Sequence, residues 1–265
     1  MEDALGHLFY YSHVYQILLV FQLVSSILVL LFLFYKSAPY GKFVTNGFGP
    51  VMPARPGWVI MEFPAFAVIL VMFYLGRGWE NPAMIVFICL WEFHYVYRTF
   101  IYPLRLSKGS RPMAVAIPLT GAFFNSINGY INGYEMFLSP DAAVKYDSSW
   151  FLTPYFIVGT GLFVAGWVIN QHSDAVLRSL RKPGETGYKI PNRGLHKWVA
   201  SPNYFGEFME WLGWAVLTAS WAGLAFAAFT FANLGPRAYK NLQWYKEKFG
   251  DEYPSSRKAM IPFVF

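Results

Sequence analysis

The chain has 265 residues, of which 55% are hydrophobic, 20% aromatic and only 14% charged. A soluble domain carries about 25% charged residues, so too little charge is present to cover a soluble surface. The net charge of +6 does not indicate nucleic-acid binding, because the basic residues lie between apolar segments and not on one face of a soluble module. Cys89 is the sole cysteine, which excludes a disulfide framework and a cysteine-based metal site. No metal ion is expected.

Apolar segments of membrane length recur along the chain. A helix needs roughly 20 mostly apolar residues to cross a hydrocarbon core of about 30 Å. We therefore predict an all-α integral membrane protein with seven transmembrane helices, at residues 10–35, 58–75, 80–104, 112–134, 150–171, 204–219 and 222–236. The last two divide a stretch too long for one untilted span, and Ser220, Trp221 and Gly223 predict the tight turn between them.

The positive charges predict the orientation. Nearly all of the 21 lysines and arginines fall in alternate connections, whereas the opposite connections hold only Arg77 and Lys145. Positive loops face the cytosol, so we expect the N-terminus outside and the C-terminus in the cytosol. Glu2 and Asp3 precede the first apolar segment in place of basic residues, which favours a span over a cleaved signal peptide.

Ionisable residues within the predicted spans indicate an internal polar site, since each costs about 2.5 to 3.5 kcal/mol to insert. They are Glu62, then Glu92, His94 and Arg98, then Glu207 and Glu210. On the third span Trp91, Tyr95 and Arg98 follow the spacing of one helix face. Two interpretations remain open at this point: the stripe lines a binding site, or Arg98 neutralises Glu62 or Glu92 and Tyr95 lies at the membrane interface.

The longest polar connection runs from Gln171 to Pro202, and together with the C-terminal segment it is rich in Arg, Lys, Asn and Asp. Such a set suits a phosphorylated ligand, because arginine binds phosphate bidentately, but positive charge beside a membrane is also a topology signal. The glycine run VGTGLFVAG lacks the third glycine at the dinucleotide-binding spacing and lies within a span. No Rossmann domain is therefore predicted.

Several motifs in order along the chain resemble one family. The segment HSDAVLRSLRKPGETGYKIPNRGLHKWVASPNYFGEFMEWLGW, the ending DEYPSSRKAMIPFVF, and the elements YGKF, MEFPAF and HYVYRTFIYPL are similar to those of steroid 5α-reductases. The resemblance covers nearly the whole chain. It implies a single membrane-embedded domain over residues 1–265, with 1–111 mainly on the substrate side and 112–265 mainly on the cofactor side.

The resemblance also implies the reaction: NADPH-dependent reduction of the 4,5 double bond of 3-oxo-4-ene steroids, with hydride transfer to carbon 5. Glu62 and Tyr95 are expected to hydrogen-bond the 3-ketone, where donors stabilise the negative charge that develops. Trp58, Phe66 and Phe124 are expected to line the substrate pocket. The residues expected to hold NADPH are Tyr40, Arg98, Arg111, Asn170, Asp174, Arg181, Asn203, Glu207, Arg237 and Tyr245.

Two positions depart from mammalian members: Met61 stands where they carry glutamine, and Asn241 where they carry histidine. The expected partners are the steroid, NADPH and the lipid bilayer, and the expected assembly is a monomer. A eukaryotic host implies the endoplasmic reticulum and a bacterial host the inner membrane. Three alternatives remain: a reductase of another unsaturated lipid such as an enoyl thioester or polyprenol, an isoprenylcysteine-type membrane methyltransferase, and a sterol transporter or receptor.

Overall fold

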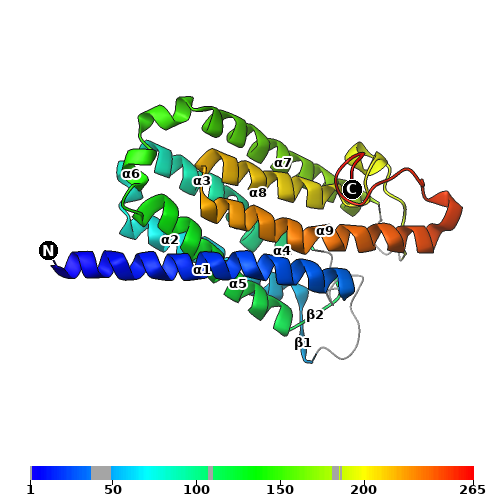
Figure 1. Cartoon of the computed structure of the whole chain (residues 1–265). Coiled ribbons are helices and arrows are strands. Elements are labelled where there is room, and N and C mark those ends of the chain that lie inside the picture. The colour runs from blue at the N-terminus through cyan, green and yellow to red at the C-terminus, as the bar shows by residue number, and fades with distance from the viewer. Residues whose placement is uncertain (1, 37–48, 107–109, 181–184, 186) are drawn as a thin grey trace. The chain divides into compact units, whose positions relative to one another are not determined.

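The computed structural model describes residues 2–36, 49–106, 110–180, 185 and 187–265, with side chains from residue 12 onward (Figure 1). Most of it is helical. The α-helices are α1 (Glu2–Tyr35), α2 (Ala54–Leu75), α3 (Pro82–Val96), α4 (Tyr102–Arg105), α5 (Ala116–Gly133), α6 (Ala142–Lys145), α7 (Pro154–Ser179), α8 (Pro202–Thr218) and α9 (Trp221–Phe249). Two π-helical turns, Tyr97–Ile101 and Tyr134–Leu138, extend α3 and α5.

Short elements complete the fold. Strands β1 (Val51–Met52) and β2 (Met113–Ala114) pair antiparallel, with Val51 opposite Ala114. The 3-10 turns are Gly78–Glu80, Ser148–Leu152, Gly194–Lys197 and Gly250–Glu252.

The helical class predicted from the sequence is confirmed, and a long helix lies at each of the seven predicted segments. Within the described residues, three stretches are long and apolar enough to cross a membrane: Ser12–Tyr35, Ala54–Leu75 and Pro82–Arg105. The predicted turn before α9 is also present, since α8 ends at Thr218 and Ala219 adopts a left-handed φ of 44°. The α9 helix is longer than predicted, because it continues through Pro236 to Phe249.

The chain forms two compact units. Unit 1 comprises Met1–Gln22, Ala38–Thr153 and Ser220–Ala222, and unit 2 comprises Leu23–Ser37, Pro154–Ala219 and Gly223–Phe265. In unit 1, α2 packs on α3 and α5, and the fully buried Trp91 indole donates to the Ala65 carbonyl at 3.1 Å. A polar contact lies inside this unit as well, where buried Gln22 on α1 donates to Asn128 on α5 at 3.1 Å.

In unit 2, glycines bring the backbones of α7 and α8 into direct contact. A Cβ on Gly159 or Gly166 of α7 would lie 2.2 Å from the Leu217 nitrogen or 2.3 Å from the Glu210 nitrogen. A Cβ on Gly206 or Gly213 of α8 would likewise lie 2.5 Å from the Asn170 nitrogen or 2.4 Å from the Phe163 nitrogen of α7. Small residues at helix interfaces permit this close approach in membranes. The run VGTGLFVAG therefore serves helix packing, and the contact sets the distance between polar side chains farther along the two helices.

The C-terminal segment pairs with the loop before α8. Val199 and Lys258 form a parallel bridge, and the Ala200 and Ser201 N–H groups donate to the Lys258 and Ala259 carbonyls at 2.9 and 3.1 Å. An apolar cluster lies behind this pairing and contains Ala200, Leu234, Ala238, Leu242, Tyr245, Tyr253, Ala259 and Met260. The loop is thus fixed from two sides, by α7 and by the C-terminal segment.

Candidate functional site

Glu62 is a buried carboxylate on α2, with 8% of its surface exposed. Its Oε1 lies 3.5 Å from the Arg98 Nε in the π-helical turn that follows α3. The Arg98 guanidinium is in turn flanked by two rings, since its Cζ lies 4.7 Å from the centroid of Trp58 and 4.8 Å from that of Tyr102. Of the two carboxylates that the sequence offered to Arg98, the structure pairs it with Glu62.

The other oxygen of Glu62 accepts a hydrogen bond from a residue that sequence reasoning missed. Asn125 on α5 is 6% exposed, and its Nδ2 donates to Glu62 Oε2 at 3.1 Å and to the Met61 carbonyl at 2.7 Å. The amide of Asn125 thus holds both the backbone and the carboxylate of α2 at this point.

Tyr95 is buried on α3, with 2% exposed. Its ring packs on Trp91 at a centroid distance of 5.0 Å and meets His94 edge-on. On the helix Tyr95 comes one turn before Arg98, so both belong to the stripe expected from the sequence. Neither Glu62 nor Tyr95 faces outward, which is the arrangement that a polar site within a membrane requires.

The three predicted substrate-pocket aromatics all lie in unit 1. Trp58 lies with Arg98, as described, and meets Tyr102 edge-on at 5.0 Å. Phe66 packs against Phe63 and Phe100, at 5.9 and 5.4 Å. Phe124 is half-buried on α5, next in sequence to Asn125.

A second polar set lies in unit 2, where α7 and α8 are in backbone contact. Asn170 Nδ2 donates to the Asn203 carbonyl at 3.0 Å and lies 3.5 Å from Glu207 Oε2. Asn203 Nδ2 donates to Asp174 Oδ1 at 3.1 Å. Four of the predicted cofactor residues are therefore joined by direct hydrogen bonds. Asn170 and Asp174 come from α7, and Asn203 and Glu207 come from α8.

The other predicted residues of unit 2 that the structure describes lie on α9. Arg237 Nη2 donates to the Tyr204 hydroxyl at 3.1 Å, with its Cζ 5.2 Å from that ring. Tyr245 is buried and stacks on Tyr253 at 5.2 Å with an angle of 9° between the rings. Asn241, one of the two departures from the mammalian pattern, donates to the Ser201 hydroxyl at 3.0 Å.

Three further residues of the predicted cofactor set do not lie among the contacts described above. Arg111 is exposed in unit 1. Tyr40 and Arg181 lie outside the described residues. Among its described members the predicted cofactor set is thus divided, with Arg98 and Arg111 in unit 1 and six in unit 2.

Two buried side chains fix the loop between α7 and α8. His196 is 1% exposed, and its Nε2 lies 3.3 Å from the Ser173 carbonyl, to which it donates in the matching tautomer. Burial lowers the pKa of His196 to about 4, so the ring is neutral at physiological pH. Arg257 is 3% exposed and donates to the Pro191 carbonyl at 2.8 Å and to Asn192 Oδ1 at 3.1 Å.

Fold and site together define a helical membrane protein with a buried acid–guanidinium pair in one unit and a hydrogen-bonded polar set in the other. Comparison with known proteins refines this class. A family model described as 3-oxo-5-alpha-steroid 4-dehydrogenase matches residues 111–265. The chain belongs to this family, whose members are oxidoreductases acting on CH–CH bonds.

Individual relatives from plants and mammals extend the match beyond residue 111. A steroid 5-alpha-reductase of Gossypium hirsutum is 41% identical over 236 residues, which cover 88% of this chain and 90% of the relative. The 3-oxo-5-alpha-steroid 4-dehydrogenase 1 of Rattus norvegicus is 42% identical over 229 residues, or 86% of each chain. The human protein of the same name is 40% identical over 228 residues, covering 85% of this chain and 86% of its own length. The family resemblance seen in the motifs is confirmed.

Proposed function

We propose that this protein reduces the 4,5 double bond of 3-oxo-4-ene steroids to the 5α product, with NADPH as the hydride donor. The observation that carries the proposal is the buried Glu62 carboxyl, held between Asn125 and Arg98 in a chain of this family. Reduction of an enone leaves negative charge on the ketone oxygen, and preorganised donors at that oxygen lower the barrier.

Tyr95 and Glu62 are the proposed ketone-binding groups. The Tyr95 phenol donates directly, and Glu62 donates when its carboxyl holds a proton. Their burial in unit 1 excludes water, which strengthens each hydrogen bond to the developing charge. Trp58, Phe66 and Phe124 supply aromatic surface for a flat apolar ring system in this proposal.

The polar set of unit 2 has the donors and acceptors that a dinucleotide phosphate needs. Asp174 and Glu207 offer carboxylates for ribose hydroxyls, Asn170 and Asn203 offer amides, and Arg237 offers a cation for phosphate. NADPH, when bound, supplies the hydride. The chain's own contribution is to hold these side chains in register through the glycine contacts of α7 and α8. Tyr40, Arg98, Arg111, Arg181 and Tyr245 complete the proposed cofactor-binding set.

The proposed membrane topology has seven spans, with the N-terminus outside and the C-terminus in the cytosol. Three helices of spanning length and apolarity support multi-pass insertion, and the basic connections support the orientation. We further propose that the protein functions as a monomer, as one membrane-embedded domain, in the endoplasmic reticulum or a bacterial inner membrane.

Activity of the purified protein tests the function directly. Testosterone or progesterone with NADPH is expected to give the 5α product, and the same assay with an enoyl thioester or a polyprenol separates the rival lipid substrates. A methyltransferase would be active with S-adenosylmethionine and not with NADPH, so assays with each cofactor in turn test that alternative. Lack of any steroid turnover by well-folded protein would overturn the proposal.

Two variants test the assigned roles. Glu62→Gln and Tyr95→Phe should each lower kcat/KM at least tenfold, since removal of one oxyanion donor typically costs about 10² to 10³ in rate. Tyr97→Phe is the control, because Tyr97 lies two residues from Tyr95 and its hydroxyl accepts from Arg105 at 3.1 Å. Wild-type rates in both test variants would exclude these roles.

A further inference from the structure

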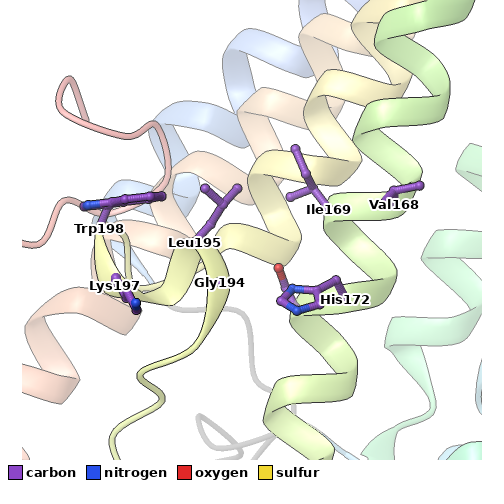
Figure 2. A pocket seen from close by; sticks show the side chains of 8 residues that line it. Val168, Ile169, His172, Gly194, Leu195, Lys197 and Trp198 are labelled. Atoms are coloured by element: carbon purple, nitrogen blue, oxygen red, sulfur yellow. The ribbon is translucent and has the colours of Figure 1, made fainter.

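Unit 2 contains a pocket of about 350 Å³ between α7 and the turn Gly194–Lys197 (Figure 2). Its wall is mainly apolar, with Ile169 from α7 and Leu195 and Trp198 from the loop. His172, Ser173 and Lys197 are the polar residues of the lining. None of these residues belongs to the proposed substrate or cofactor set.

The pocket lies on a different face of α7 from the polar set. Asn170 and Asp174 are four residues apart and share one face of the helix. His172 lies midway between them in sequence, which turns its side chain about 200° from that of Asn170 at 3.6 residues per turn. A ligand in the pocket therefore does not occupy the proposed cofactor site.

Gly194 shapes the wall of the pocket. Its φ of 56° is in the left-handed region, which glycine adopts without strain. A Cβ there would lie 2.4 Å from His172 Cε1, so a glycine is needed for the loop to pass against the imidazole. The turn is also held from behind, because buried His196 contacts the carbonyl of Ser173, another lining residue.

The apolar part of the pocket continues onto an outward-facing row of aliphatic side chains. Ile157, Val164 and Val168 follow the helical spacing of one face of α7 and are 60%, 49% and 52% exposed. A row of exposed aliphatic side chains of this kind marks a site of membrane or partner contact. Beyond the pocket, Trp198 is 45% exposed and its ring lies 6.0 Å from that of the exposed Phe263. Tryptophan is the residue enriched where a membrane meets water.

We propose that this pocket binds an anionic phospholipid, with an acyl chain along the aliphatic row of α7 and the phosphate beside Lys197 and His172. The inference rests on the proposed topology, which places this end of α7 at the cytosolic surface, where anionic lipids attract basic side chains. The apolar wall selects against a free anion. The cationic group at its side favours an anionic headgroup over a zwitterionic one.

Lipid binding by the full-length protein in a neutral detergent tests the proposal. Phosphatidylglycerol should raise the Tm by about 2 to 4 °C more than phosphatidylcholine with the same acyl chains, and native mass spectrometry should show the retained lipid. Inorganic phosphate should give no such rise. An equal rise with phosphatidylcholine, or with inorganic phosphate, would overturn the proposal.

Variants of pocket residues test whether the stabilisation by phosphatidylglycerol arises from binding in this pocket. Lys197→Gln removes the cation, and Leu195→Trp fills the apolar part with an indole; both should lose most of the phosphatidylglycerol effect. Lys246→Gln removes the same charge from an exposed lysine of α9 and should keep the effect. If Leu195→Trp does not fold, Lys197→Gln alone decides, since an exposed side chain can be changed without loss of packing. An undiminished lipid effect in Lys197→Gln contradicts the assignment.

The lipid measurement is independent of catalysis. Lys197→Gln should reduce steroid at the wild-type rate in lipid-free detergent, because Lys197 lies outside the proposed reaction site. If the wild type fails to reduce steroid but still responds to phosphatidylglycerol through Lys197, the proposed function fails while the lipid site stands.

Discussion

The side-chain amide of Asn125 on α5 donates at 3.1 Å to the carboxylate of Glu62 on α2, and both residues are buried. The same amide nitrogen donates to the Met61 carbonyl at 2.7 Å. Asn125 therefore fixes the carboxyl group of Glu62 relative to α2, and Arg98 lies against its other oxygen. The position of the proposed ketone-binding acid depends on three elements of unit 1.

Asn125→Ala should lower kcat/KM for steroid by up to about tenfold, because the hydrogen bond that positions the protonated Glu62 carboxyl is worth about 0.5 to 1.5 kcal/mol. The Kd for NADPH should stay at the wild-type value, which separates a positioning role from general loss of structure. Asn125→Asp should be the more damaging change, since it places a second carboxyl beside Glu62. Steady-state kinetics and NADPH titration make the measurement.

Ser126→Ala is the matched control for Asn125. Its hydroxyl bonds within α5, to the Ala122 carbonyl at 2.9 Å, and does not touch α2 in that bond. Near-wild-type kinetics are expected. A loss in Ser126→Ala as large as that in Asn125→Ala would show that any change in this turn is harmful and would remove the specific role.

Gly166→Ala should destabilise unit 2 and weaken NADPH binding. The added methyl would lie 2.3 Å from the Glu210 nitrogen and 2.6 Å from the Gly206 carbonyl oxygen, so α7 and α8 must separate and Asn170 moves away from Asn203. Overpacking of this kind costs about 1 to 3 kcal/mol, which a thermal melt detects. Gly161→Ala on the same helix meets nothing within 4 Å and should leave the Tm at or above that of the wild type.

Stability should fall in acid through His196. The ring is neutral in the folded protein because burial lowers its pKa to about 4, whereas an unfolded chain has the ordinary value of 6.5. Below pH 6.5 the unfolded state takes up the proton and the folded state does not, so the folded state loses stability as the pH falls from 6.5 to 4. The largest loss from this group is about 3 kcal/mol.

Melting curves between pH 7.5 and pH 4.5 check this prediction, with His196→Asn as the comparison. The variant should start with a lower Tm at neutral pH and show a shallower decline in acid, because an amide does not titrate in this range. Parallel declines in the two proteins would mean that other groups cause the acid sensitivity.

Glu135 should stabilise the start of α9. Its carboxylate accepts from the backbone nitrogens of Trp221 and Ala222 at 3.0 and 2.7 Å and from the Tyr15 hydroxyl at 2.7 Å. It satisfies donors that a helix N-terminus leaves without partners and complements the helix dipole. Glu135→Ala should therefore cost about 1 to 2 kcal/mol, like the loss of an N-cap. Tyr15→Phe removes one of the three bonds and should lower the Tm by less.

Local patterns were sufficient to predict the helices and part of the site. The apolar segments, the turn at Ser220 and the face shared by Tyr95 and Arg98 all depend on neighbours within a few residues. Asn125 was missed because its role depends on contact with Glu62, 63 residues away. Asn125, Asn128 and Asn132 follow the spacing of one face of α5 and are all buried, which is the local signal that could have drawn attention to this residue. The role of Glu135 also depends on remote contacts, since its partners on α9 are 86 and 87 residues distant.

The glycine contacts between α7 and α8 could be predicted from the sequence only in part. Gly159 and Gly166, like Gly206 and Gly213, are seven residues apart, a spacing visible in the sequence. The sequence alone does not say that the two pairs face each other, since that requires the register of α7 against α8. Likewise, Met61 contributes its backbone carbonyl to the contact with Asn125, and this is not predictable from the identity of its side chain.

The bridge between Val199 and Lys258 has a consequence for synthesis. The loop before α8 completes its hydrogen bonds only with residues that the ribosome makes some sixty positions later. The α7–α8 hairpin can therefore form and pack through its glycines while the loop is still open on one side. A chain that ended before Lys258 would still contain α7 and α8. The Ala200 and Ser201 N–H groups of the loop would then lack the carbonyls to which they donate.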